Sequence, residues 1–149
     1  MAQPFRYRLR VRYGECDPQQ VVFNARYADY VDVALIEFMH AVGWGPKALV
    51  ARGLDMQVVK LTLEWRAAAR FDDVVEVRVE TLSVGNSSLR LAFDMRRLSD
   101  ETALCQAEGV YVMVSAGALA KARVPDDVRE SFEAGAPGAL CDQSGSRAG

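Results

Sequence analysis

Apolar and polar residues alternate along the first part of the chain, and then the period changes. In residues 5–13 (FRYRLRVRY) every second residue is apolar and the residues between them are arginines. Such alternation predicts a strand with one buried face and one cationic face. From Tyr27 to Val42 the apolar residues recur every three or four positions, which predicts a long amphipathic helix. We expect Asn24 to cap the start of this helix and Gly43 to end it.

Most of the chain after this helix returns to the two-residue period of strands. Four strands are predicted, at residues 59–69, 75–80, 89–96 and 103–114. The connections between them are short and contain turn residues, so antiparallel pairing is expected. The last strand is apolar at most positions, which predicts burial of both its faces. Short helices are expected at residues 46–52 and 125–133.

The order of these elements predicts the fold class. One strand, one long helix and four further strands indicate an α+β domain in which a five-stranded antiparallel sheet wraps around the long helix. A length of 149 residues suits a single domain. Residues 135–149 (GAPGALCDQSGSRAG) are rich in Gly, Ala and Ser, so the domain is expected to span residues 1–134 and to be followed by a disordered tail.

Composition and charge narrow the class of function. A net charge of −2 argues against a broad cationic face for nucleic acid or anionic membranes. No apolar run is long enough to span a bilayer, and the N-terminus lacks the apolar core of a secretory signal. The cysteines Cys16, Cys105 and Cys141 match no disulfide or zinc framework, so a reduced, cytoplasmic compartment is expected. With His40 as the sole histidine, a transition-metal site is not expected.

The stretch GECDPQQVVFNARY, residues 14–27, carries the candidate chemistry. It places the carboxylate of Asp17 just before a helix N-terminus. Free backbone N–H groups at such a terminus can polarise a carbonyl and stabilise an oxyanion. A nearby carboxylate can activate water or attack the carbonyl itself. These parts suit acyl transfer, although an Asp-Pro pair is also common in turns that have no catalytic role.

The same stretch resembles the 4-hydroxybenzoyl-CoA thioesterase family of hotdog-fold enzymes. The matching residues are Asp17-Pro18, Val21-Val22-Phe23 and Tyr27, and the later segments FDDVVEVRVE and GNSSLRLAFDM also fit the family. The resemblance covers about residues 5–134. It implies a curved antiparallel sheet around the long helix. It also implies a homodimer with a continuous sheet and active sites between the subunits, with a tetramer of two such dimers as an alternative assembly.

The resemblance also implies a function. It predicts hydrolysis of an aryl- or short- to medium-chain acyl-CoA, with acyl carrier protein as an alternative carrier and without a metal or redox cofactor. Asp17 is the expected catalytic residue, as general base or as nucleophile, and a backbone N–H near Asn24 is expected to bind the thioester carbonyl. The expected substrate-binding residues around them are Val22, Phe23, Asn24 and Tyr27.

Three departures from the family pattern keep other interpretations open. Gln20 stands where relatives usually have Gly, and Asn24 stands where they often have His or Tyr. The turn at residues 85–87 is neutral, whereas some relatives carry basic residues there that meet the CoA phosphates. Candidate replacements are Arg90, Lys121 and Arg123, for each of which solvated surface charge is an equal alternative.

An alternative from a different class of function is a non-catalytic hotdog module that binds an acyl thioester or a partner protein. The changes at Gln20 and Asn24 motivate it, and Asp17 argues against it. A hotdog hydratase would need an Asp/His pair, for which His40 is badly placed.

Overall fold

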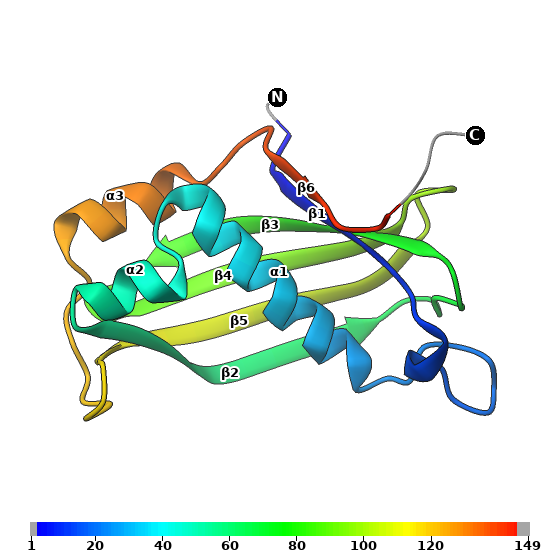
Figure 1. Cartoon of the computed structure of the whole chain (residues 1–149), viewed down its shortest axis with the longest axis horizontal. Helices are drawn as coiled ribbons and strands as arrows, with labels where there is room; N and C mark the ends of the chain where they lie inside the picture. The colour runs from blue at the N-terminus through cyan, green and yellow to red at the C-terminus, as the bar shows by residue number, and fades with distance from the viewer. Residues whose placement is uncertain (1–2, 146–149) are drawn as a thin grey trace.

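A computed structural model describes residues 3–145 of the chain (Figure 1). A six-stranded sheet is its largest part, and three helices lie against it. The strands are β1 (Phe5–Arg10), β2 (Leu54–Trp65), β3 (Val74–Val84), β4 (Ser88–Arg97), β5 (Ala103–Ser115) and β6 (Leu140–Asp142). The helices are α1 (Arg26–Val42), α2 (Pro46–Ala51) and α3 (Asp126–Ala134), and a single 3₁₀ turn, η1 (Tyr13–Glu15), follows β1.

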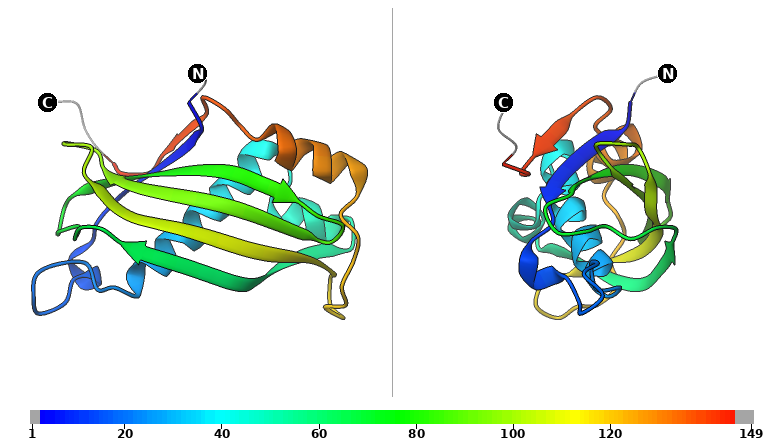
Figure 2. Two further views of the ribbon diagram at one scale, coloured as in Figure 1. Left: turned by 180° about the vertical axis from the view of Figure 1, so that it is seen from behind. Right: turned by 90° about the vertical axis from the view of Figure 1, so that its right-hand side faces the viewer.

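The sheet has the strand order β2-β5-β4-β3-β1-β6. Every neighbouring pair is antiparallel except β1 and β6, which are parallel. The sheet curls around α1, as the end-on view in Figure 2 shows. The predicted α+β class and the wrapped helix are therefore present, with one strand, β6, beyond the five expected, and α2 and α3 lie where the two short helices were expected.

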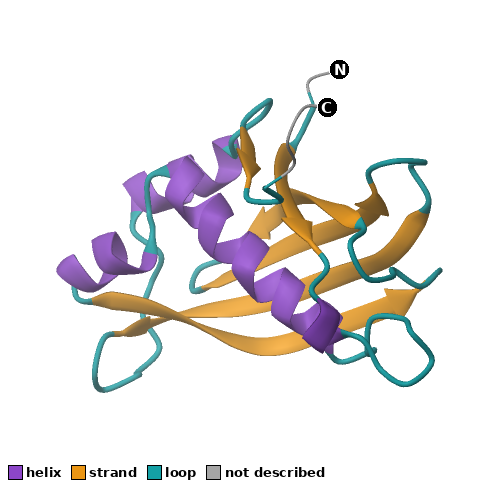
Figure 3. Ribbon diagram, turned by 45° about the vertical axis from the view of Figure 1, so that its right-hand side comes forward, coloured by secondary structure: helices purple, strands orange, loops and turns teal. Residues whose placement is uncertain are grey.

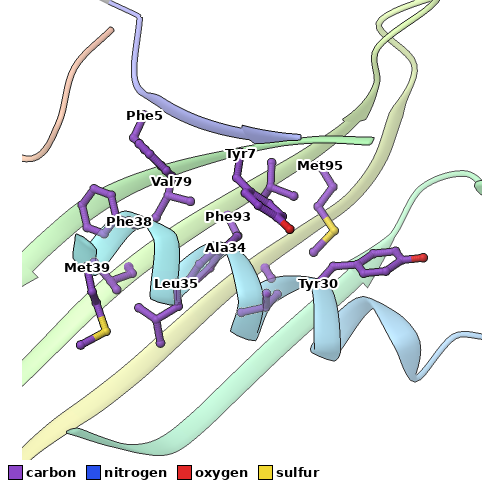
Figure 4. Packing of buried hydrophobic residues seen from close by; sticks show 14 of the residues in the cluster. Phe5, Tyr7, Tyr30, Ala34, Leu35, Phe38, Met39, Val79, Phe93 and Met95 are labelled. Carbon is purple, nitrogen blue, oxygen red and sulfur yellow. The ribbon is translucent and has the colours of Figure 1, made fainter. Parts of the chain in front are cut away.

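The core lies between α1 and the concave face of the sheet (Figure 4). The predicted apolar stripe of α1 is buried, and Phe38 packs against Phe5 of β1 with ring centroids 5.6 Å apart. The alternation in β1 also holds, because Phe5, Tyr7 and Leu9 are buried and the arginines between them are partly exposed. Tyr13, which continues that alternation in the sequence, lies beyond the strand in η1 and is 80% exposed.

The C-terminal segment differs from the expected disorder. Residues 140–142 form β6 and pair with residues 6–8 of β1. The Tyr7 hydroxyl donates a 2.8 Å hydrogen bond to Gln143, and Ala136, Ala139 and Cys141 pack on the core. The edge of β1 offers unpaired backbone groups, which a prediction from composition does not consider. For residues 135–145 that prediction is wrong, and residues 146–149 lie outside the described part of the chain.

Three local predictions also need correction. Helix α1 begins at Arg26 after an uncapped Ala25, so Asn24 does not cap it. The strand predicted at residues 59–69 starts at Leu54 and ends at Trp65. In β5 one face is buried, but Val110 and Val112 on the other face are only partly buried in the single chain. Gly43, by contrast, ends α1 in the left-handed conformation (φ 91°) as expected.

The two edges of the sheet are unlike each other. At one edge, β6 covers β1. At the other, β2 has no outer neighbour among residues 3–145, and Val58 and Val59 are 57% and 61% exposed. A break in the β2–β5 register between Val58 and Lys60 lies at the same place. Within residues 3–145, no helix combines the length and apolar character that a membrane span requires.

Candidate active site

The loop that carries Asp17 is a tight hairpin between η1 and α1. Cys16 and Val22 form an antiparallel bridge at its base. The Asp17 N–H donates to the carbonyl of Val21 (2.9 Å), and the Gln20 N–H donates to the carbonyl of Asp17 (2.8 Å). Gln20 closes this turn with a φ of 65°, a conformation that favours glycine. The chain therefore has Gln, and not the Gly that is usual in relatives, at a position where the backbone is left-handed.

The Asp17 carboxylate has both a turn role and a free oxygen. Its Oδ1 accepts a 2.8 Å hydrogen bond from the Gln19 N–H, as in other Asx turns. Its Oδ2 accepts none from any residue that the structure describes. The side chain is half-buried. The hydrogen bond fixes the carboxylate on its loop and leaves one oxygen available for a water or a carbonyl carbon.

The start of α1 lies beside this loop (Figure 3). The backbone N–H groups of Asn24 and Ala25 have no acceptor among residues 3–145. The Trp65 indole donates a 3.3 Å hydrogen bond to the carbonyl of Asn24, which ties this turn to the end of β2. Free donors at the positive end of a 17-residue helix are suited to a carbonyl oxygen or an oxyanion.

Asp17 borders two cavities. The first, of about 320 Å³, lies next to the start of α1 and includes Val22, Asn24, Tyr27, Trp65 and Ala67 in its wall. The second, of about 650 Å³, is bordered by Tyr13, Cys16, Pro18, Gln20, Arg70 and Phe71. A molecule that reacts at Asp17 can therefore extend from it in two directions.

Val22 and Tyr27 hold the wall of the first cavity in place. The Val22 N–H donates to the carbonyl of Ala69 (2.9 Å), and the Ala69 N–H donates to the Tyr27 hydroxyl (3.0 Å). Burial raises the pKa of Tyr27, so its hydroxyl stays neutral at physiological pH. Of the expected substrate-binding residues, Val22 and Tyr27 border this cavity, whereas Phe23 is exposed and borders neither of the two cavities.

Glu15 is a site-supporting residue that the sequence did not reveal. Its Oε1 accepts hydrogen bonds from the Tyr30 hydroxyl (2.9 Å) and from the Arg12 N–H (2.8 Å), and its carbonyl accepts one from the Phe23 N–H (2.9 Å). Burial, followed by the Glu15 carboxylate, raises the pKa of Tyr30. Glu15 thereby joins η1, the base of the Asp17 loop and α1. No periodicity links it to Tyr30, which lies 15 residues away.

The three predicted phosphate ligands lie away from these cavities. Arg90 pairs with Glu108 (Nε to Oε1, 3.0 Å), and Arg123 pairs with Asp126 (2.9 Å). Lys121 pairs through its backbone with Val114 near the end of β5, whereas the loop between β1 and α1 lies at the opposite end of the sheet (Figure 1). Within a single subunit, the structure does not bring these cations to Asp17.

Other clusters of reactive side chains are small. Glu37 Oε2 lies 3.5 Å from His40 Nδ1 and 3.6 Å from Cys141 Sγ. Burial, followed by the charge of Glu37, raises the pKa of Cys141 and favours its neutral thiol. In the part of the chain that the structure describes, no three His, Cys, Asp or Glu side chains are arranged to hold a metal ion.

Comparison with known proteins places this chain in a family. Residues 11–132 match the model of the thioesterase-like superfamily. The acyl-CoA thioester hydrolase YbgC of Escherichia coli is 31% identical over 130 residues, which cover 87% of this chain and 96% of the relative.

Solved structures agree with this match. A hypothetical protein from Thermus thermophilus superposes with a TM-score of 0.80 at 29% identity, covering 87% of this chain and 97% of that protein. A 1,4-dihydroxy-2-naphthoyl-CoA thioesterase from Synechocystis shares the fold, with a TM-score of 0.78 at 15% identity over 86% of this chain and 94% of that one. The chain therefore belongs to the thioesterase-like superfamily and is a hotdog-fold thioester hydrolase, as its sequence predicts.

Proposed function

We propose that the chain hydrolyses an acyl-CoA thioester beside Asp17, which acts as the catalytic residue. One observation carries this proposal: Asp17, with its free Oδ2, and Asn24, whose N–H has no acceptor among residues 3–145, both border the first cavity. The name of the Escherichia coli relative, an acyl-CoA thioester hydrolase, supports CoA as the carrier.

In the proposed reaction the helix N-terminus acts on the carbonyl and Asp17 acts on the nucleophile. The thioester oxygen accepts a hydrogen bond from the N–H of Asn24, just before the start of α1, which stabilises the oxyanion as it forms. Asp17 removes a proton from water while the water oxygen bonds to the carbonyl carbon. The C–S bond then breaks, and the departing thiolate takes up the proton to give the free acid and CoA.

A nucleophilic route uses the same geometry. Asp17 attacks the carbonyl carbon itself, the thiolate leaves, and water cleaves the resulting mixed anhydride. A single turnover in ¹⁸O-labelled water tests for this route. Label in the carboxylate of Asp17 supports the nucleophilic route, because attack of water on the Asp17 carbonyl carbon of the anhydride places it there, whereas label in the product acid alone is expected from the general base and also from attack of water on the acyl carbon of the anhydride.

The proposal includes a homodimer formed through β2. This edge is open and carries exposed valines, whereas the β1 edge is already covered by β6. If two β2 strands pair antiparallel, the end of one subunit that carries Asp17 lies beside the opposite end of the other. The Lys121 end of a second subunit would then approach the site. Further pairing of such dimers gives a tetramer.

The test is a panel of thioesters incubated with the full chain, with release of free CoA followed by chromatography. The panel contains aryl, short-chain and medium-chain acyl-CoAs and one acyl group carried on acyl carrier protein. We expect turnover of at least one acyl-CoA class. Saturable binding without turnover across the whole panel would favour the non-catalytic module, the alternative that the unusual Gln20 and Asn24 motivate.

A further inference from the structure

The larger cavity at Asp17 contains one cation and two aromatic rings that the proposed chemistry does not use. Among the described residues, the Arg70 guanidinium has no carboxylate or other partner. Tyr13 and Phe71 are 80% and 54% exposed, and they pack edge to face with centroids 5.7 Å apart. Exposed aromatic side chains beside an unpaired cation are typical of binding surfaces.

The backbone that presents Arg70 is held in place from several sides. The Arg97 guanidinium donates to the carbonyl of Ala68 (2.9 Å) and to the carboxylate of Asp73 (3.0 Å). The same Asp73 oxygen accepts a 2.9 Å hydrogen bond from the Arg70 N–H. Asp73 also joins this loop to the end of β1, because its carbonyl accepts from the Val11 N–H (2.9 Å). Arg70 and Phe71 therefore extend from a fixed segment.

The chemistry of a thioester assigns different contents to the two cavities. The acyl group and the coenzyme arm leave the carbonyl carbon in different directions, and Asp17 borders both cavities. Only the coenzyme arm carries phosphates. The first cavity contains one cation, Arg66, but its charge is already paired with Glu64 at 2.7 Å. The second cavity contains the unpaired Arg70.

We propose that the cavity of Tyr13, Arg70 and Phe71 binds the phosphorylated coenzyme arm, and that its adenine packs against the two rings. This inference rests on the proposed function and names the subsite for the carrier. Arg70 meets a phosphate, which it can hold with two parallel N–H donors. The acyl group then occupies the first cavity, between the start of α1 and Trp65.

The cations predicted from sequence are weaker candidates for this role. Arg90 and Arg123 are neutralised by Glu108 and Asp126. Lys121 forms no ion pair within the described chain. Lys121 pairs, however, with Val114 near one end of β5, whereas Leu104 near the other end of β5 bonds to the loop beside the first cavity. Ten residues of strand correspond to about 30 Å, so only Lys121 of a second subunit can reach the site.

The test measures the affinity of the full chain for free CoA, 4′-phosphopantetheine and pantetheine by titration calorimetry. Because none of these is a thioester, binding is measured whether or not the chain hydrolyses acyl-CoA, and failure of hydrolysis alone counts only against the proposed function. Arg70→Gln should weaken binding of CoA and of 4′-phosphopantetheine about fivefold, the effect of roughly 1 kcal/mol. It should leave pantetheine and the melting temperature unchanged.

Two further variants separate the parts of the proposal. Phe71→Ala should weaken binding of CoA about fivefold. It should leave the affinity for 4′-phosphopantetheine, which is also the arm of acyl carrier protein, nearly unchanged. Arg123→Gln is the matched control and should change none of the three affinities.

The proposal is overturned if Arg70→Gln leaves CoA affinity within twofold of wild type, or if it weakens binding of pantetheine equally. It is also overturned if Lys121→Gln, and not Arg70→Gln, weakens binding of CoA and 4′-phosphopantetheine while leaving binding of pantetheine unchanged. Equal losses of CoA and 4′-phosphopantetheine in Phe71→Ala would contradict adenine packing.

Discussion

The Glu15 side chain supports the site through a single carboxylate oxygen, which makes its role separable from catalysis. Both the Tyr30 hydroxyl and the Arg12 N–H donate to Oε1. In Glu15→Gln the amide oxygen can accept both bonds, so we expect kcat within about threefold of wild type, well short of the loss of a catalytic group. In Glu15→Ala the buried Tyr30 hydroxyl loses its partner, which should cost about 1–3 kcal/mol of folding free energy and lower kcat.

The measurement is a comparison of kcat and unfolding free energy for these two variants with Tyr30→Phe. If the Glu15–Tyr30 hydrogen bond is responsible, Tyr30→Phe and Glu15→Ala should be strongly non-additive. A Glu15→Gln variant that loses activity as severely as Glu15→Ala would mean that the charge of Glu15 takes part in the reaction.

At the scale of elements, the C-terminal segment is part of the sheet. Deleting residues 136–149 removes β6, the Tyr7–Gln143 hydrogen bond and the 2.9 Å bond from Arg10 to the carbonyl of Ser144. We expect a loss of unfolding free energy on the order of 1–3 kcal/mol, and greater aggregation because the β1 edge is exposed. Tyr7→Phe, which removes one of these bonds and keeps β6, should lose less. An unchanged melting temperature in the deletion variant would show that β6 contributes nothing to stability.

The elements that the sequence predicts well are those with a strong local period. The apolar stripe from Tyr27 to Met39 and the alternation in β1 each fix a buried face. β6 has only three residues and gains its order from the edge of β1, so no local pattern indicates it. The residue types of the Asp17 loop indicate a candidate site in the sequence. Arg70 and Phe71 reach the same cavity from more than 50 positions away, through contacts that a single sequence does not encode locally.

At the scale of the whole molecule, the open β2 edge predicts a homodimer. Light scattering at micromolar concentration should give at least twice the chain mass of 16.4 kDa. Val58→Glu should shift the population toward monomer, because it places a charge on the exposed edge. Leu82→Glu is the matched control, since Leu82 is 47% exposed on β3, which is paired on both sides, and should leave the dimer intact. A wild-type protein that stays monomeric would contradict this account of β2.

The central claim is that Asp17 performs the chemistry, and Asp17→Asn tests it most directly. Asparagine can keep the Oδ1 hydrogen bond from the Gln19 N–H, so the turn, the melting temperature and the affinity for free CoA should be nearly unchanged. It neither accepts a proton at neutral pH nor attacks a carbonyl efficiently. The measurement is kcat with the best acyl-CoA of the panel, made beside melting temperature and CoA affinity. We predict a loss of at least about 10²-fold, the lower end of the general acid–base range, and a kcat within about threefold of wild type would contradict the account.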